Sequence, residues 1–292
     1  MRKSYSEASA RERVLGILDA GSFTELVPPS ERASSPHLAQ LDQPVAFDDG
    51  LIAGRGLLAG KPVLIAAQEG RFLGGAVGEV HGAKLVGLIR RAVAEKPSAV
   101  LILFDSGGVR LHEANAGLIA VSEILRAICA ARADGVRLIG LVGGSAGCFG
   151  GTGLIARCCD TLAISEEGRL AMSGPEVIET VHGVEEFDSR DRALVWRVTG
   201  GKHRYLQGEA DCICADDIAD FRAAAIALTD GPAGLTLEDV EREHAQLAAR
   251  WETFSDCDDG LDVWRRLGVA QPEDVPMLAT DEFTAIADEV RP

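Results

Sequence analysis

The fold is decided at Phe104-Asp105-Ser106-Gly107-Gly108-Val109-Arg110-Leu111-His112-Glu113. This stretch ends an apolar run at residues 99–104, which has the length and composition of a strand buried on both faces. After it, apolar residues recur every three or four positions as far as Ile128, so we expect a helix to follow directly. The glycine pair therefore brings backbone N–H groups to the positive end of a helix dipole. Such a place stabilises an oxygen that carries negative charge.

The composition is that of a soluble globular enzyme. The chain has 292 residues, of which 47% are hydrophobic and 25% are charged, and this is enough to bury a substantial core. Its formal net charge of −16 disfavours nucleic acid or an anionic membrane as the main partner. Every apolar run is far shorter than the roughly 18 residues that a membrane span needs. We therefore expect a cytoplasmic protein with no nucleic-acid partner and no membrane span.

Seven cysteines are scattered along the chain without a C-x-x-C pair. An odd number with this spacing argues against a disulfide framework and against a four-cysteine zinc site. We expect them to be small apolar residues in a reducing compartment, and we expect no bound metal. The first three residues include two basic ones, but polar residues follow at once, so no signal peptide is expected.

Strands alternate with helices through the middle of the chain. We predict buried strands at 63–67, 99–104, 136–142 and 161–164, and helices at 82–94 and 112–132, the last ending at Gly135. Such alternation indicates parallel βαβ units and an α/β fold.

The two ends of the chain have other patterns. Residues 7–20 have the pattern of a short amphipathic helix, and the proline-rich residues 27–44 have that of an extended arm. Beyond 235 the chain turns helical and acidic, with a helix start at Thr236. We expect three parts: an N-terminal helix and arm at 1–44, the α/β domain at 45–234, and a helical acidic tail at 235–292.

Two glycine turns follow two successive predicted strands, at 107–108 and 150–151. Each can offer one or two backbone donors to the same carbonyl oxygen, and two converging donors make an oxyanion hole. The alternative is that these glycines only permit tight turns and close packing. The candidate donors are Gly107, Gly108, Val109, Gly150 and Gly151.

Other residues have two interpretations each. His112 and Glu113 lie at the mouth of the first turn and could act as acid or base, or they could cap the helix or meet a partner. Arg110 could bind a carboxylate or phosphate, or form a structural ion pair. Arg71 and Lys84 could hold phosphates. The basic residues at 190–204 form either a solvated face or a dock for an anionic arm.

Gly143-Gly144-Ser145-Ala146-Gly147 also fits the G-x-S-x-G nucleophile elbow of α/β-hydrolases. That elbow needs a helix immediately after its serine. The glycines between Ser145 and Thr152 make such a helix start unfavourable. We therefore interpret Ser145 as a small loop residue and keep a serine acyl-hydrolase as an alternative function.

Several motifs together resemble the carboxyltransferase family on its acyl-thioester side. They are Gly21-Ser22-Phe23-Thr24-Glu25-Leu26, Phe72-Leu73-Gly74-Gly75 with Gly78, Ser106-Gly107-Gly108-Val109-Arg110-Leu111-His112-Glu113 and Gly150-Gly151. Three more are similar to the beta subunits of malonate decarboxylases in particular: Ala66-Ala67-Gln68-Glu69-Gly70-Arg71-Phe72, Gly78-Glu79-Val80-His81-Gly82-Ala83-Lys84 and Glu185-Glu186-Phe187-Asp188-Ser189-Arg190-Asp191-Arg192. The resemblance covers roughly residues 10–230 and leaves out the acidic tail.

The resemblance implies a crotonase-like spiral of ββα units with a helical C-terminal tail. The substrate would be a malonyl thioester on an acyl carrier protein, and its loss of CO2 would leave an enolate held by the glycine turns. The chain itself would bind no cofactor; the carrier's CoA-like prosthetic arm would be held by Arg71, Gly74, Gly75, Lys84 and Arg110.

The resemblance also implies partners: a gamma-type subunit of the same fold, the carrier protein and an acyltransferase (alpha) subunit. The bacterial acetyl-CoA carboxylase counterpart carries a four-cysteine zinc ribbon, which this sequence lacks, and this departure argues against acetyl-CoA carboxylase. The carboxyltransferase half of an acyl-CoA carboxylase is kept as an alternative. A non-catalytic scaffold that only grips the carrier arm is another.

Overall fold

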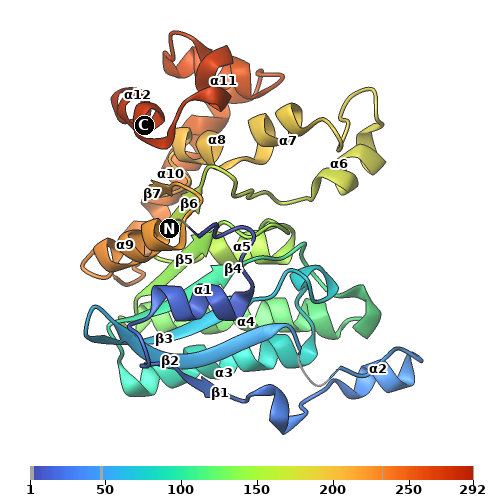
Figure 1. Cartoon of the computed structure of the whole chain (residues 1–292). Coiled ribbons are helices and arrows are strands. Elements are labelled where there is room, and N and C mark those ends of the chain that lie inside the picture. Colours follow the sequence, from blue (N-terminus) through green and yellow to red (C-terminus); the bar gives the residue numbers. More distant parts are fainter. Residues whose placement is uncertain (1–2, 47–48, 232, 292) are drawn as a thin grey trace.

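A computed structural model of the chain describes residues 3–46, 49–231 and 233–291 (Figure 1). Its described part contains one seven-stranded sheet whose strands lie side by side in chain order. They are β1 (Thr24–Leu26), β2 (Leu51–Leu58), β3 (Lys61–Gln68), β4 (Ala99–Phe104), β5 (Leu138–Val142), β6 (Thr161–Ser165) and β7 (Cys212–Cys214). The first three strands pair antiparallel, and from β3 to β7 every pair is parallel. The strands predicted by alternation are confirmed.

Helices connect and cover these strands. The α-helices are α1 (Ala10–Ile17), α2 (Pro36–Gln40), α3 (Glu79–Glu95), α4 (Ala116–Ala133), α5 (Gly151–Arg157), α6 (Pro175–His182), α7 (Arg192–Thr199), α8 (Gly201–Leu206), α9 (Ile218–Leu228), α10 (Leu237–Phe254), α11 (Gly260–Leu267) and α12 (Thr280–Val290). Short 3-10 turns occupy η1 (Pro29–Glu31), η2 (Leu73–Gly75), η3 (Leu111–Glu113) and η4 (Pro272–Met277).

Strand β4 is buried along its whole length and divides the core into two layers. Its Val100, Ile102 and Phe104 pack in the layer that contains α3 and α4. Its alternate residues pack in the other layer, together with α1 and α9. Figure 1 shows α3 and α4 on one side of the sheet and α1 on the other. This two-sided burial confirms the prediction made from the unbroken apolar run.

Two predictions about the connecting segments were wrong. The helix does not follow the first glycine turn directly, because residues 111–113 form η3 and α4 begins only at Ala116. Glu113 is drawn into the interior by an ion pair with Arg110, and this interrupts the helical path. The arm at 27–44 is not simply extended, since it contains η1 and α2, and Leu38 and Ser35 are buried.

The C-terminal tail is helical, as predicted. Thr236 and Asp239 form a capping box that starts α10. Helix α10 buries none of its residues, and its apolar Leu237, Leu247 and Trp251 are exposed. Within the described ranges, no helix is long and apolar enough to cross a membrane. The division at residues 44 and 234 stays a prediction.

Candidate active site

The two glycine turns lie against each other at the carboxyl ends of β4 and β5. Ser106 and Cys148 form a parallel bridge, in which the Ser106 N–H donates to Gly147 O at 2.7 Å and the Phe149 N–H donates to Ser106 O at 3.0 Å. The approach is so close that a Cβ added to Gly150 would lie 3.5 Å from Gly108 Cα. The sheet register therefore brings together the two turns that the sequence paired.

Three of the five candidate N–H groups already have acceptors. Gly107 donates to Gly74 O at 2.8 Å, Gly108 to Ser106 Oγ at 3.1 Å and Gly150 to Met172 O at 3.1 Å. These bonds hold the shape of the turns. In the part of the chain that the structure describes, the N–H groups of Val109 and Gly151 meet no acceptor. One free donor thus remains on each turn.

Gly151 is the first residue of α5, so its N–H has no acceptor within the helix. A Cβ at this position would lie 2.8 Å from Val121 Cγ2 and 3.3 Å from Val109 Cγ2. Only a residue without a side chain lets the second turn come this near to the first. Two free donors that converge on one oxygen would stabilise the oxyanion of an enolate or a tetrahedral intermediate.

A buried charge cluster anchors the chain directly after Val109. Arg110 Nη1 lies 2.7 Å from Asp49 Oδ1 and 2.7 Å from Glu113 Oε1, and Glu113 Oε2 accepts the N–H of Glu79 at 2.6 Å. All three charged side chains are almost fully buried. Burial raises the pKa of Asp49 above its ordinary value, although the Arg110 charge opposes the shift. The cluster fixes the first turn on the amino end of α3.

A family model for the carboxyl transferase domain matches residues 4–233, which include both glycine turns. The chain belongs to the carboxyltransferase family. The malonyl-S-ACP:biotin-protein carboxyltransferase MADC of Malonomonas rubra is 42% identical over 314 residues, which cover 99% of this chain and 97% of that protein. The propionyl-CoA carboxylase beta chain of Saccharopolyspora erythraea is 32% identical over 70% of this chain but only 36% of that protein.

Solved structures give the same family. A chain of a Pseudomonas malonate decarboxylase hetero-tetramer in complex with malonate superimposes with a TM-score of 0.81 and 36% identity, over 91% of this chain and 97% of that one. A chain of the Pseudomonas malonate decarboxylase MdcD-MdcE hetero-dimer superimposes with a TM-score of 0.66 and 35% identity. The fold of this carboxyltransferase is crotonase-like, as the sequence motifs predicted. The acyl-CoA carboxylases are its more distant relatives.

The other candidate residues of this carboxyltransferase lie in several surroundings. Gly75 packs on the backbone of Asp105, where a Cβ would lie 1.8 Å from the Asp105 oxygen. Arg71 is exposed and donates to Glu7 O at 2.6 Å, and the half-buried Lys84 donates to Leu51 O. Gly74 has a positive φ of 64° and supplies the acceptor for Gly107. Gly74 and Gly75 therefore shape the first turn.

The predicted acid–base pair is separated. His112 is exposed, whereas Glu113 points inward to Arg110. Both carboxylate oxygens of Glu113 accept hydrogen bonds from protein donors. Both Nη atoms of Arg110 donate to protein acceptors. These contacts use Arg110 and Glu113 to hold the first turn. The signal that sequence reasoning missed is Asp49, an acidic residue far from Arg110 along the chain.

Ser145 has none of the surroundings of a nucleophile elbow. It is exposed, its carbonyl oxygen accepts a hydrogen bond from Arg169, and the next helix, α5, begins only at Gly151. The carboxyltransferase therefore offers no strand–serine–helix elbow at this position. The described residues also contain no group of three His, Cys, Asp or Glu side chains placed to hold a metal.

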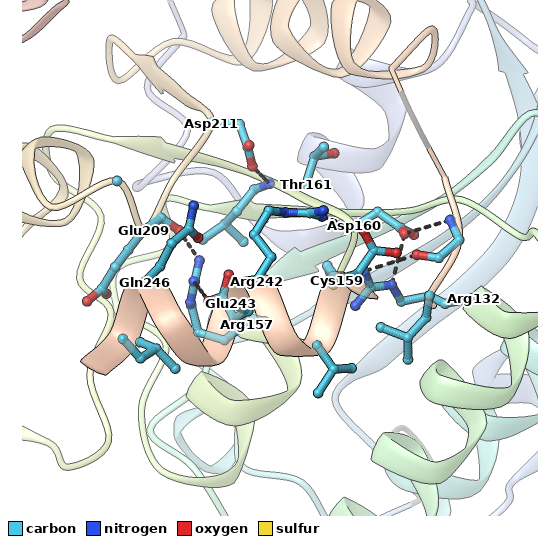
Figure 2. Close-up of a pocket in the computed structure, with 18 of the residues that line it drawn as sticks. Arg132, Arg157, Cys159, Asp160, Thr161, Glu209, Asp211, Arg242, Glu243 and Gln246 are labelled. Atoms are coloured by element: carbon cyan, nitrogen blue, oxygen red, sulfur yellow. Dashed lines mark hydrogen bonds and ion pairs between the residues drawn. The ribbon is translucent and has the colours of Figure 1, made fainter. Parts of the chain in front are cut away.

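A large pocket lies elsewhere, between α10 and the body of the protein (Figure 2). Its volume is about 650 Å³, and it is lined by charged residues that include Arg132, Asp160, Arg157 and Glu243. Many of these are paired with one another, as Arg132 is with Asp160 at 2.8 Å. No residue of either glycine turn lines this pocket, so the candidate site is not there.

Proposed function

We propose that this chain is the subunit of a malonate decarboxylase that removes CO2 from a malonyl thioester on an acyl carrier protein. The observation that carries the proposal is the pair of free N–H groups, Val109 and Gly151, on two touching turns. The full-length similarity to a malonyl-S-ACP carboxyltransferase and to malonate decarboxylase structures supports the substrate class.

The chemistry requires stabilisation of one developing charge. The bond between the carboxylate carbon and the methylene carbon breaks, CO2 leaves, and the electron pair forms an enolate whose charge lies on the thioester oxygen. Removing one well-placed backbone donor raises the free energy of the transition state by about 3–4 kcal/mol. A proton then adds to the methylene carbon and gives the acetyl thioester. We assign no proton donor, because Glu113 is committed to Arg110.

We further propose that a second subunit of the same fold completes the site. Large apolar side chains stay exposed around the turns: Leu111, Leu118 and Ile119 follow the first turn, and Leu154 and Met172 border the second. Exposed apolar patches of this kind mark interfaces. The Pseudomonas relatives are a hetero-tetramer and a hetero-dimer, which supports the presence of a partner subunit. The carrier protein and an acyltransferase subunit would be further members of the assembly.

For the carrier's CoA-like arm we retain Arg71 as the charged contact, because its side chain is exposed at the segment that leads to Gly74. Lys84 of α3 is half-buried and donates to Leu51 O of β2, so we give it a structural role between α3 and β2. No cofactor bound by the chain itself is part of the proposal.

The test is a comparison of thioesters. The purified complex of this chain with its partner subunit is mixed with malonyl and acetyl thioesters of the carrier, and CO2 and acyl products are followed. The proposal expects CO2 and acetyl thioester in equal amounts from the malonyl thioester alone. Release of free malonate instead would favour the serine acyl-hydrolase, and no turnover with the complete complex would favour the carrier-binding scaffold.

A second candidate function differs only in the fate of the carboxyl group. The 42% identical Malonomonas protein is a malonyl-S-ACP:biotin-protein carboxyltransferase, which favours transfer to biotin in place of release. Both reactions pass through the same enolate and need the same two donors. Adding a biotinylated carrier protein decides between them, since transfer yields carboxybiotin and release yields CO2 whether or not biotin is present.

A further inference from the structure

An ion pair lies buried beneath the two glycine turns. Arg13 of α1 and Asp105, the residue before the first turn, approach to 2.7 Å, and both side chains are almost completely inaccessible. Arg13 is held on its other side by the carbonyl oxygens of Tyr5 and Ser6, at 2.8 and 3.1 Å. The N-terminal segment therefore delivers one fixed positive charge to the end of β4.

The Asp105 carboxylate uses its other contacts to join the turns. Its Oδ1 accepts the N–H of Ala146, in the loop between β5 and the second turn, at 2.7 Å, and its Oδ2 accepts the N–H of Gly70 at 3.3 Å. Its own backbone N–H donates to Gln68 Oε1 at 3.1 Å. A single side chain thus connects the chain ends of β3, β4 and β5.

The space around this carboxylate is closed. A Cβ added to Gly144 would lie 2.2 Å from Asp105 Cγ, and one added to Gly70 would lie 2.6 Å from the carboxylate oxygens. Neither the carboxylate nor the loops can shift without a clash, because interiors are close-packed. The Asp105 side chain therefore fills the space between the loops that lead to the two turns.

Resting on the proposed function, we propose that Asp105 is the positioning residue that fixes the spacing between the Val109 and Gly151 donors, with Arg13 as its neutralising partner. Asp105 lies four residues before Val109. Ala146, whose N–H donates to the Asp105 carboxylate, lies five residues before Gly151. A buried carboxylate can hold this place only when it is paired, which explains why α1 reaches under the turns.

The test uses the complex with three variants. Asp105→Asn keeps the size of the side chain and one acceptor oxygen, but it removes the negative charge. Arg13 then faces either the amide NH2 group or a neutral amide oxygen. We expect kcat to fall by about 30-fold or more, with KM changed by less than about threefold, because the donors act on the transition state. In Arg13→Gln/Asp105→Asn the pair is neutral on both sides, and we expect at least about a fivefold recovery of kcat over the single variant.

Asp160→Asn is the matched control. Asp160 pairs with Arg132 at 2.8 Å (Figure 2), and its side chain is as buried as that of Asp105. It accepts the N–H of Leu138 at 2.8 Å, and Leu138 begins β5, so Asp160 lies at the end of β5 away from the turns. The Asp160→Asn complex should lose about as much thermal stability as the Asp105→Asn complex, and it should keep its kcat. An Asp105→Asn complex with wild-type kcat, or a loss of kcat no larger than that of the Asp160→Asn complex, overturns the proposal. If Asp105→Asn does not fold, the double variant is compared with Asp160→Asn in the same way.

Amide hydrogen exchange over residues 105–110 and 144–151 separates this proposal from the proposed function. Exchange should accelerate in Asp105→Asn and return toward the wild-type rate in the double variant, whichever acyl thioester the complex uses. A wild-type complex without decarboxylation would refute the proposed function while this exchange pattern still supported the positioning role. Unchanged exchange in a folded Asp105→Asn complex overturns the positioning role.

Discussion

Removing the Gly151 N–H should abolish half of the oxyanion site without changing the rest of the turn. Gly151→Pro deletes this donor, and proline is tolerated at the first position of a helix because that N–H has no intrahelical acceptor. Gly108 is unsuitable for the same test, since its φ of 129° excludes proline and its N–H already donates to Ser106 Oγ.

The control must carry the same added Cβ. A Cβ at 151 would meet Val121 Cγ2 at 2.8 Å, so both Gly151→Pro and Gly151→Ala are placed in a Val121→Ala background that removes this contact. Truncating the buried Val121 costs on the order of 1–3 kcal/mol of stability in both variants, so the cost cancels in the comparison. The two proteins then differ chiefly in one N–H group.

The expected difference follows from the value of a single donor. Loss of one oxyanion-hole hydrogen bond costs about 2.7–4 kcal/mol, which is about 100- to 1,000-fold in kcat. The assay is single-turnover release of labelled CO2 from malonyl thioester by the complex, with folding checked by circular dichroism. If the proline variant decarboxylates within about threefold of the alanine variant, Gly151 is not an oxyanion donor and the reasoning fails.

Three further predictions concern other parts of the molecule. Ser145→Ala should keep at least about a tenth of the activity, because decarboxylation through an enolate needs no serine nucleophile; an acyl group trapped on Ser145 by mass spectrometry would contradict this. Burial lowers the pKa of His81 to about 3, whereas in the unfolded chain it is about 6.5. Between these two values only the unfolded state binds the proton. The free energy of unfolding should therefore fall by about 2 kcal/mol from pH 7 to pH 5. His81→Gln should remove that part of the slope in urea titrations, and an unaltered slope would count against it. Arg192→Glu should weaken carrier binding at low salt and not at high salt. If the variant and the wild type bind the carrier equally well at low salt, Arg192 belongs to a solvated face. Arg204 is not suitable for this test because it pairs with Glu209.

The sequence alone was enough for the elements whose pattern is local. The six-residue run at 99–104 could hardly be anything other than a strand buried on both faces, and β4 is one. The repeated strand–glycine–helix order then placed both glycine turns at the same edge of a parallel sheet. Thr236 with Asp239 likewise fixed the start of α10 through a contact between near neighbours.

The donors could not be chosen among the five candidates from the sequence. Whether a backbone N–H is free depends on which acceptor the fold brings to it, and Gly74 O, Ser106 Oγ and Met172 O occupy three of the five. Arg110 is similar: its pattern fits a substrate contact, and only its pairing with the distant Asp49 shows that the charge is used internally. Contacts made between residues far apart along the chain leave no periodic signal.

The pairing of Asp105 could not be predicted from the sequence. Asp105 stands in the stretch that decides the fold, but its partner Arg13 lies in the N-terminal part, outside the predicted α/β domain. Its role depends on Gly70 and Gly144 lying against its carboxylate, a closeness that arises only in the folded chain.

The central claim is that this chain stabilises a malonyl-derived enolate, and deuterium incorporation tests it most directly. The complex is allowed to turn over malonyl thioester in heavy water, and the acetyl thioester is analysed by mass spectrometry together with the CO2 released. The account predicts CO2 and acetyl thioester in equal amounts, with deuterium added to the methyl group when the enolate is protonated. Malonate set free by thioester hydrolysis, with no CO2 and no deuterated acetyl product, would contradict it.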